Sequence, residues 1–216
     1  MSKLTVVSDF DGTISLHELG EIILKKFAPD DWEKFYSQMI RGNLSFDECI
    51  TKQYSLICEK NREKIINSIQ DKCELRKGFR NFVDLVNKNN SQFLIVSGGL
   101  DFIVDYCLQG NNISNVQYIA PRIKLDSRGA TLLPPSRAIV NFGRSNFKMD
   151  LVVRLKLSDR KVLYIGDGIS DFAPASIADM VFAVKGSTLE KKCRNDGMAY
   201  RSFSDFEEVK NFIISS

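Results

Sequence analysis

The chain has 216 residues, 44% of them hydrophobic and 26% charged, with a formal net charge of +3. This composition is ordinary for a soluble globular protein, and the length suffices for one large domain or for a core with an insertion. The small basic excess is not gathered into a block, which argues against a nucleic-acid partner. We expect a cytoplasmic protein without a membrane span, because no apolar run is long enough to cross a bilayer and the N-terminus becomes acidic too early for a signal peptide.

The first predicted element is a strand over Leu4 to Val7, and it leads directly into Asp9-Phe10-Asp11-Gly12-Thr13. Side chains alternate along a strand, so Asp9 and Asp11 project to the same side and can share a cation or a substrate. Gly12 then lets the chain turn away. Two adjacent carboxylates are costly to desolvate unless a divalent metal or another positive group lies nearby. The alternative interpretation is a plain Asp-Gly turn that closes the strand.

Residues 15–75 contain no convincing strand, only amphipathic helical segments. Ser45 and Glu48 have the spacing of a capping box, which marks a helix start. We predict an all-helical cap at 15–75, inserted into a core formed by 1–14 and 76–216. The predicted helices of the cap are Glu18 to Phe27, Asp31 to Ile40, Phe46 to Cys58 and Arg62 to Ile69.

After the cap, short apolar strands alternate with amphipathic helices, which predicts an α/β fold with a doubly wound, Rossmann-like parallel sheet. The segment Ile123 to Leu133 holds an Asp-Ser-Arg-Gly turn between two apolar stretches and predicts a β-hairpin flap. Ser187 with Glu190, and Ser204 with Glu207, have capping-box spacing and predict two C-terminal helices. The predicted core strands are Gln92 to Val96, Lys161 to Ile165 and Met180 to Val184, and the predicted core helices are Phe79 to Asn87, Leu100 to Leu108 and Phe147 to Leu157.

The cysteines are odd in number and show no paired metal-ligand spacing. We expect all of them to be reduced thiols that pack as small apolar side chains, which agrees with a cytoplasmic location. They are Cys49, Cys58, Cys73, Cys107 and Cys193.

Polar residues follow two further predicted strands. Ser97-Gly98-Gly99 offers a hydroxyl and backbone N–H groups that suit a phosphate, and Asp167 and Asp171 lie on a glycine-containing loop. Ligands of an open α/β sheet bind outside the carboxyl ends of its strands, so these groups are expected to converge on the acids of the first strand. Lys148, near the start of the predicted helix Phe147 to Leu157, is a further candidate. Taken singly, these residues have ordinary explanations: Ser97 lies in a common type of turn, Asp171 can cap a helix N-terminus, and Lys148 can be a plain helix residue.

In this order the motifs resemble those of the haloacid dehalogenase superfamily of phosphatases, over essentially the whole chain. The signature is Asp9-Phe10-Asp11-Gly12-Thr13, and Ser97, Lys148, Asp167 and Asp171 match the later motifs. The helical insertion is similar to the small cap of phosphoserine phosphatases. Further stretches resemble the methylthiopentenyl phosphate phosphatases of methionine salvage: Phe27-Ala28-Pro29 with Trp32, Lys77-Gly78-Phe79-Arg80, Ser97-Gly98-Gly99-Leu100-Asp101-Phe102, Phe182-Ala183 and Asp205-Phe206.

The resemblance implies a magnesium-dependent phosphatase of a small, soluble phosphate monoester. Asp9 would attack phosphorus and form an aspartyl phosphate. Asp11 would protonate the leaving alcohol and later accept a proton from water. Asp9, the backbone carbonyl of Asp11 and Asp167 would hold Mg²⁺.

The remaining matched residues would neutralise charge at the phosphate and hold it in position. Lys148 would offset negative charge, and Asp171 would orient Lys148 or Asp167. Ser97 and the Gly98 amide would hold the phosphoryl oxygens. Transfer of the phosphoryl group to another small alcohol, and a non-catalytic phosphate-binding regulatory role, are the alternative functions. The protein is expected to be a monomer or a homodimer.

Three features bear on the substrate. Glu18 matches an acid that reads the substrate amine in phosphoserine phosphatases, but Ser15 and Glu18 also have the spacing of a capping box. Ala130 to Asn146 has no cysteine, whereas the salvage phosphatases carry a cysteine-rich stretch before the lysine. Gly12 stands where phosphoserine phosphatases usually have serine.

Overall fold

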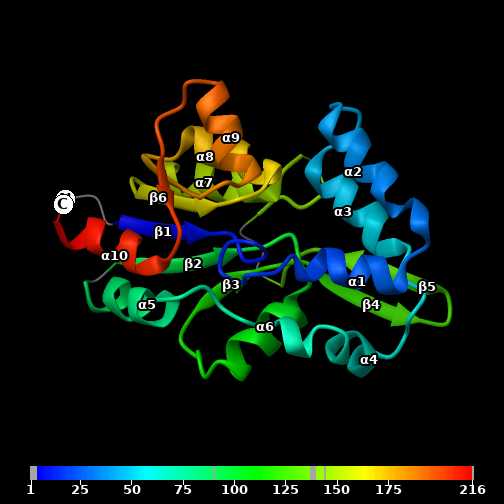
Figure 1. The fold of residues 1–216 in the computed structure, drawn as a ribbon. Helices are drawn as coiled ribbons and strands as arrows, with labels where there is room; N and C mark the ends of the chain where they lie inside the picture. Colours follow the sequence, from blue (N-terminus) through cyan, green and yellow to red (C-terminus); the bar gives the residue numbers. More distant parts are fainter. Residues whose placement is uncertain (1–3, 90, 137–139, 144, 216) are drawn as a thin grey trace.

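The computed structural model describes residues 4–89, 91–136, 140–143 and 145–215. Its central sheet has six parallel strands (Figure 1). The inner strands are buried nearly throughout, as expected when helices cover both faces of a parallel sheet. In spatial order the strands are β3 (Gln117–Ile119), β2 (Gln92–Val96), β1 (Leu4–Ser8), β6 (Lys161–Gly166), β7 (Met180–Val184) and β8 (Arg201–Phe203).

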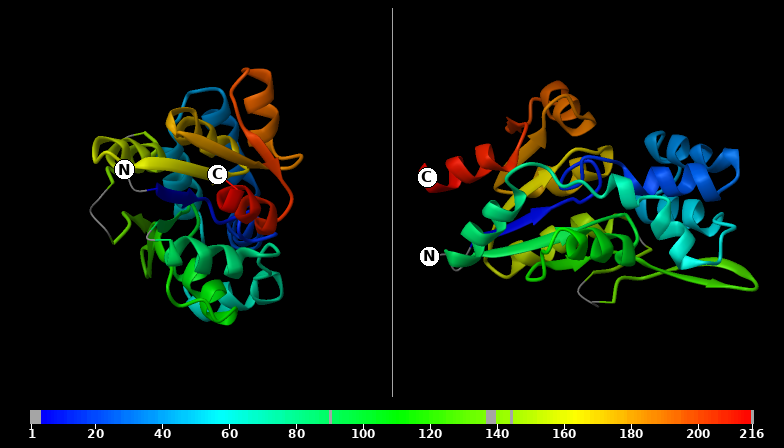
Figure 2. Two further views of the ribbon diagram at one scale, coloured as in Figure 1. Left: turned by 90° about the vertical axis from the view of Figure 1, so that its left-hand side faces the viewer. Right: turned by 60° about the horizontal axis from the view of Figure 1, so that its bottom comes forward.

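Helices pack on both faces of this sheet, so the predicted doubly wound α/β fold is confirmed (Figures 1 and 2). Aromatic rings join one helical layer to the sheet, with the Phe79 and Phe206 centroids 5.1 Å apart and Phe93 edge-on to Phe79. No helix within the described ranges is both long and apolar enough to cross a membrane. One face carries α5 (Phe79–Lys88), α6 (Asp101–Gly110) and α10 (Phe206–Ser215), and the other carries α7 (Phe147–Leu157), α8 (Phe172–Ile177) and α9 (Thr188–Asn195).

Between β1 and α5 the chain forms helices that lie beyond the carboxyl ends of the strands (Figure 1). The chain leaves and re-enters the core side by side, because Ser15 forms an isolated antiparallel bridge with Leu75. We call the segment between these two residues the cap. Its elements are α1 (Leu19–Phe27), the 3-10 turn η1 (Asp30–Trp32), α2 (Glu33–Ile40), α3 (Phe46–Ser55), α4 (Arg62–Asn67) and the 3-10 turn η2 (Gln70–Lys72).

The predicted flap is an antiparallel hairpin formed by β4 (Arg122–Asp126) and β5 (Gly129–Leu133). It extends from the core toward the cap, and β5 packs against α3 (Figures 1 and 2). The flap is therefore a separate two-stranded sheet that contacts the cap, and it is not part of the central sheet.

The predicted helix starts are confirmed only in part. The Ser45 and Glu48 capping box forms on both sides, with N–H to side-chain distances of 3.2 and 2.8 Å. The box predicted for Ser204 and Glu207 is wrong, because Asp205 accepts the N–H groups of the first turn of α10 instead. At α9, the Ser187 hydroxyl accepts the N–H of Glu190, while the Glu190 carboxylate turns to the N–H of Gly186.

The expectation that all cysteines are free thiols is wrong for one pair. A disulfide joins Cys73, just after η2, to Cys107 in α6, with their Cα atoms 5.2 Å apart. The two residues are 34 positions apart and meet because the end of the cap returns alongside α6. Asn111 also holds the end of the cap against α6, since its side-chain amide donates to the carbonyls of Cys73 and Cys107 at 2.9 Å each.

Candidate active site

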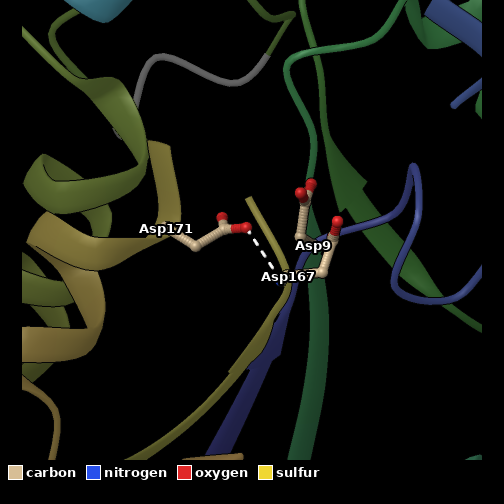
Figure 3. A group of neighbouring side chains, drawn as sticks. All are labelled: Asp9, Asp167 and Asp171. Atoms are coloured by element: carbon tan, nitrogen blue, oxygen red, sulfur yellow. Dashed lines mark hydrogen bonds between the residues drawn. The ribbon is translucent and has the colours of Figure 1, made fainter. Parts of the chain in front are cut away.

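Asp9 and Asp167 lie side by side at the carboxyl edge of the sheet (Figure 3). β1 and β6 are parallel neighbours with Ser8 opposite Ile165, so the residues that follow them emerge at one place. Figure 3 shows both carboxylates pointing the same way, with Asp171 approaching from the adjacent turn. Ligand oxygens of these aspartates lie within 4.8 Å of one another. The convergence expected from the strand order is therefore present.

Lys148 supplies a positive charge to this group from the first turn of α7. Its Nζ lies 2.9 Å from Asp9 Oδ1 and 2.8 Å from Asp171 Oδ1, and the residue is 1% exposed. Burial alone would lower the pKa of Lys148, but the charges of Asp171 and Asp9 outweigh it and raise the pKa above its ordinary value. Burial and the Asp171 charge raise the pKa of Asp9, against the opposing effect of Lys148.

Asp171 is fully buried, and both of its oxygens have partners. Oδ1 accepts from Lys148 and from the Tyr164 hydroxyl, each at 2.8 Å. Oδ2 accepts the N–H groups of Asp167 at 3.2 Å and Gly168 at 2.9 Å. Burial would raise the pKa of Asp171, but Lys148 and these hydrogen bonds lower it. Asp171 is therefore an ionised group that fixes the directions of Lys148 and of the Asp167 backbone.

Asp11 lies on the pocket side of the turn that follows β1. Its carboxylate is held against the backbone N–H groups of Gly20 and Leu19 at the start of α1, while its Oδ1 is buried without a hydrogen-bond partner in the described part of the chain. Burial raises the pKa of Asp11 to about 7. Gly99 packs against the other oxygen, since a Cβ on Gly99 would lie 2.6 Å from Asp11 Oδ2.

The turn itself is fixed by two residues that were not predicted to take part in catalysis or binding. Thr13 donates its hydroxyl to Asp167 Oδ1 at 2.5 Å. Arg76 donates to the carbonyls of Gly12 and Thr13, at 2.7 Å each, from the strand-like segment that returns from the cap. Gly12 adopts φ +72°, and a Cβ there would lie 2.6 Å from Asp167 Oδ2, so this position requires glycine.

The residues predicted to hold the phosphate fall on either side of the pocket surface. Gly98 lines the pocket, and Ser97 lies behind it, fully buried, with its oxygen accepting the Gly99 N–H at 2.9 Å. The Phe46 ring of the cap covers this turn so closely that a Cβ on Gly98 would lie 2.6 Å from it. The cap thus directly contacts the turn that follows β2.

Glu18 faces the pocket and does not cap a helix. The Ser15 hydroxyl accepts the N–H of His17, and Glu18 makes no side-chain capping bond at the start of α1, so the capping-box alternative is wrong. The Glu18 carboxyl faces that of Asp167, and partial desolvation together with the charge of Asp11 raises the pKa of Glu18 to about 7.

Core and cap enclose a pocket of about 500 Å³ that holds Asp9, Asp11, Lys148, Asp167 and Glu18 at its polar end. Most of the other cap residues that line the pocket are apolar or aromatic: Leu24, Trp32, Tyr36, Met39, Phe46, Cys49, Ile50 and Tyr54. Pockets of this kind bind small molecules whose polar group is fixed at one end.

The charges of the pocket fit a divalent cation. Acidic side chains outnumber the lysine, and among the described lining residues Lys148 is the sole lysine or arginine. Asp9, Asp167 and Asp171 form a group that could hold such an ion, and both oxygens of Asp171 already have hydrogen-bond partners. Carboxylate oxygens are the ligands that Mg²⁺ prefers.

No protein-family model matches the chain. The 2-hydroxy-3-keto-5-methylthiopentenyl-1-phosphate phosphatase of Bacillus cereus (strain AH820) is 32% identical over 211 residues, which cover 96% of this chain and 94% of the relative. The protein of that name from Bacillus anthracis shows the same identity and coverage.

Among solved structures, a phospho-aspartyl intermediate analogue of phosphoserine phosphatase matches with a TM-score of 0.73, at 18% identity, over 98% of this chain and 99% of that chain. Cytosolic 5′-nucleotidase IIIB bound to cytidine matches with a TM-score of 0.62, at 18% identity, over 99% of this chain and 84% of that chain.

The sheet order and the helical insertion after β1 give the chain the fold of the phosphoserine phosphatase structure, and an acidic pocket lies at its strand ends. Structural neighbours at this identity establish the fold alone, whereas the Bacillus relatives match in sequence over nearly their full length. The chain belongs to the family of the 2-hydroxy-3-keto-5-methylthiopentenyl-1-phosphate phosphatases.

Proposed function

We propose that this chain is a magnesium-dependent phosphatase that hydrolyses 2-hydroxy-3-keto-5-methylthiopentenyl-1-phosphate through an aspartyl phosphate on Asp9. The observation that carries the proposal is the Asp9 carboxylate, buried at the polar end of the pocket with Lys148 Nζ 2.9 Å from it. An oxygen nucleophile and a fixed positive charge at one point suit phosphoryl transfer.

Asp9 and Asp11 divide the chemistry between them. An oxygen of Asp9 attacks phosphorus, the ester P–O bond breaks, and Asp11 gives its proton to the departing alcohol oxygen. Water then attacks the phosphorus and gives a proton to Asp11, and the bond between phosphorus and Asp9 breaks to release phosphate. The packing of Gly99 against Asp11 supports this role, because it fixes the acid beside the nucleophile.

Asp9 and Asp167 would hold the magnesium ion, together with the backbone carbonyl of Asp11. When bound, the ion would supply positive charge to the phosphate and so reduce its repulsion from Asp9. The Lys148 ammonium contributes positive charge from the protein itself, and its ion pair with Asp171 orients it. Gly98 and the buried Ser97 would position the phosphoryl oxygens at the turn after β2.

The cap wall favours an ester whose organic part is uncharged and partly apolar. Burying an apolar tail against Trp32, Met39 and their neighbours stabilises the complex by about 25 cal/mol per Å² of apolar surface. The ammonium of phosphoserine could pair with Glu18, but its carboxylate would meet Glu21 and Glu33 and would find no positively charged side chain other than Lys148 among the described lining residues. These charges support a methylthio ester over an amino-acid ester as the substrate.

Phosphate release from the methylthiopentenyl ester and from phosphoserine tests this proposal. We expect kcat/KM with magnesium to be at least about 100-fold higher for the methylthiopentenyl ester, because a carboxylate left unpaired among acids is strongly disfavoured. Met39→Lys places a cation among the apolar cap residues of the pocket and should reduce the ratio of the two kcat/KM values. Ile40→Lys, at an exposed neighbour outside the pocket, should leave this ratio unchanged. Equal hydrolysis of the two esters by the wild-type chain would contradict the substrate assignment.

A further inference from the structure

Asp47 is a fully buried carboxylate in the first turn of the cap helix α3. Its oxygens accept backbone N–H groups from the core: Oδ2 accepts that of Gly143 at 2.8 Å, and Oδ1 accepts that of Phe147 at 3.0 Å. The N–H of Asp47 donates in turn to the carbonyl of Ser145 at 3.2 Å. The cap is therefore hydrogen-bonded to the backbone that opens α7.

The Phe147 bond matters because α7 carries Lys148. The first N–H groups of a helix have no acceptor within the helix and need one from elsewhere. Asn146 accepts the N–H groups of Lys148 and Met149 from within the same segment. Asp47 provides the acceptor for Phe147, so the start of α7 is completed by a residue of the cap. A carboxylate at this end of a helix is also favoured by the helix dipole.

The neighbouring residue, Phe46, extends the contact to the rest of the site. Its ring stacks on that of Phe147 with centroids 5.9 Å apart, and Lys148 Nζ lies 5.5 Å from its centroid. The same ring covers Gly98. One end of α3 therefore touches both the lysine segment and the turn that follows β2.

A buried carboxylate is costly unless hydrogen bonds satisfy it, and a neutral side chain would cap a helix at a lower desolvation cost. Two of the hydrogen bonds that Asp47 accepts come from backbone groups leading into Lys148, and the Lys148 ammonium reaches Asp9 from there.

We propose that Asp47 is a positioning residue for the phosphatase reaction: it links the packing of the cap to the placement of Lys148 against Asp9. This inference rests on the proposed function, because Lys148 is assigned there to the reacting phosphate. When the cap packs on the core, Asp47 fixes the start of α7 and with it the lysine.

Asp47→Asn is the direct test, since it keeps the size of the side chain but presents an N–H₂ group to one of the two donors. The matched control is Asp150→Asn. Asp150 holds the same stretch of chain, accepting the N–H of Asn141 at 2.8 Å, but it does so from α7 itself and not from the cap. Hydrolysis of p-nitrophenyl phosphate is measured with magnesium, at a temperature where denaturation curves show each variant to be folded.

We expect Asp47→Asn to lower kcat by about 10- to 100-fold with KM changed by less than about threefold, because a small misplacement of Lys148 affects the transition state most. Asp150→Asn should lower kcat by less than about threefold. Equal losses in both variants, or an unimpaired Asp47→Asn, would overturn the proposal. A wild-type chain that releases no phosphate from any ester would overturn the proposed function as well.

Amide hydrogen exchange of the wild-type chain gives a second readout, which decides the matter if Asp47→Asn does not fold. Inorganic phosphate with magnesium is the probe. The amides of Gly143 and Phe147 should exchange at least about tenfold more slowly with the probe, whereas the amide of Asn141, held by Asp150, should change by less than about twofold. The same change at all three amides, or none at Phe147, would show that the contact with Asp47 is independent of the site.

Discussion

Replacing Gly99 with alanine tests whether the position of Asp11 controls the reaction. The new Cβ would lie 2.6 Å from Asp11 Oδ2 and 3.2 Å from Ser97 Oγ. Gly99 is outside the set of glycines with positive φ, so alanine adds steric contact without backbone strain. Because packed atoms cannot overlap, the carboxylate must recede by about 0.8 Å to restore an ordinary contact of 3.4 Å.

A displacement of that size is large for a proton donor. Misplacing a reacting group by about 1 Å can cost on the order of 100-fold in rate, so we expect kcat to fall by roughly that factor. The free energy of unfolding should fall by about 1–3 kcal/mol, the usual cost of adding a methyl group to a packed site, which leaves the variant folded. Phosphate release and urea denaturation measure the two quantities.

Gly110→Ala is the matched control. A Cβ at Gly110, the last residue of α6, would meet no atom within 4 Å. This variant should keep its kcat and gain about 0.5–1 kcal/mol of stability, because alanine restricts the unfolded chain. If Gly99→Ala kept kcat within about threefold of the wild type, the position of Asp11 would not control the chemistry and the reasoning would be refuted.

Two further predictions concern the turn after β1 and the metal. Arg76→Ala removes the donors to the carbonyls of Gly12 and Thr13 and should lower the free energy of unfolding, measured by urea denaturation, by about 2–3 kcal/mol. The control Arg80→Ala loses a surface hydrogen bond to Asn111 and should lower it by less than about 1 kcal/mol. Equal losses in the two variants would contradict the role of Arg76. Dialysis against a chelator should abolish phosphate release, and added magnesium should restore it. Full activity after chelation would rule out the metal.

Chain order was enough to predict the central part of the site. Asp9 and Asp167 each follow a strongly apolar stretch, and parallel strands carry such residues to one edge. The two outer strands, β3 and β8, could not be predicted, because each has only three residues and exposes part of its length. Their pairing depends on the sheet that is already formed.

Other parts of the site depend on contacts that no local pattern indicates. In the sequence, Asp47 is an ordinary acid in the first turn of a helix, and only the packing of α3 on α7 gives it Gly143 and Phe147 as partners. Arg76 directly precedes Lys77-Gly78-Phe79-Arg80, but its acceptors, the carbonyls of Gly12 and Thr13, are more than sixty positions away. The Cys73 and Cys107 disulfide likewise results from the return of the cap alongside α6.

The covalent step at Asp9 is tested most directly by acid quenching during turnover, followed by mass spectrometry of the proteolytic peptides. The account predicts a phosphoryl group on Asp9, in the peptide that spans β1 and the following turn, and it predicts that Asp9→Asn folds like the wild type but shows neither this adduct nor turnover. A phosphoryl group on any other residue, or an Asp9→Asn variant with near wild-type turnover, would contradict it.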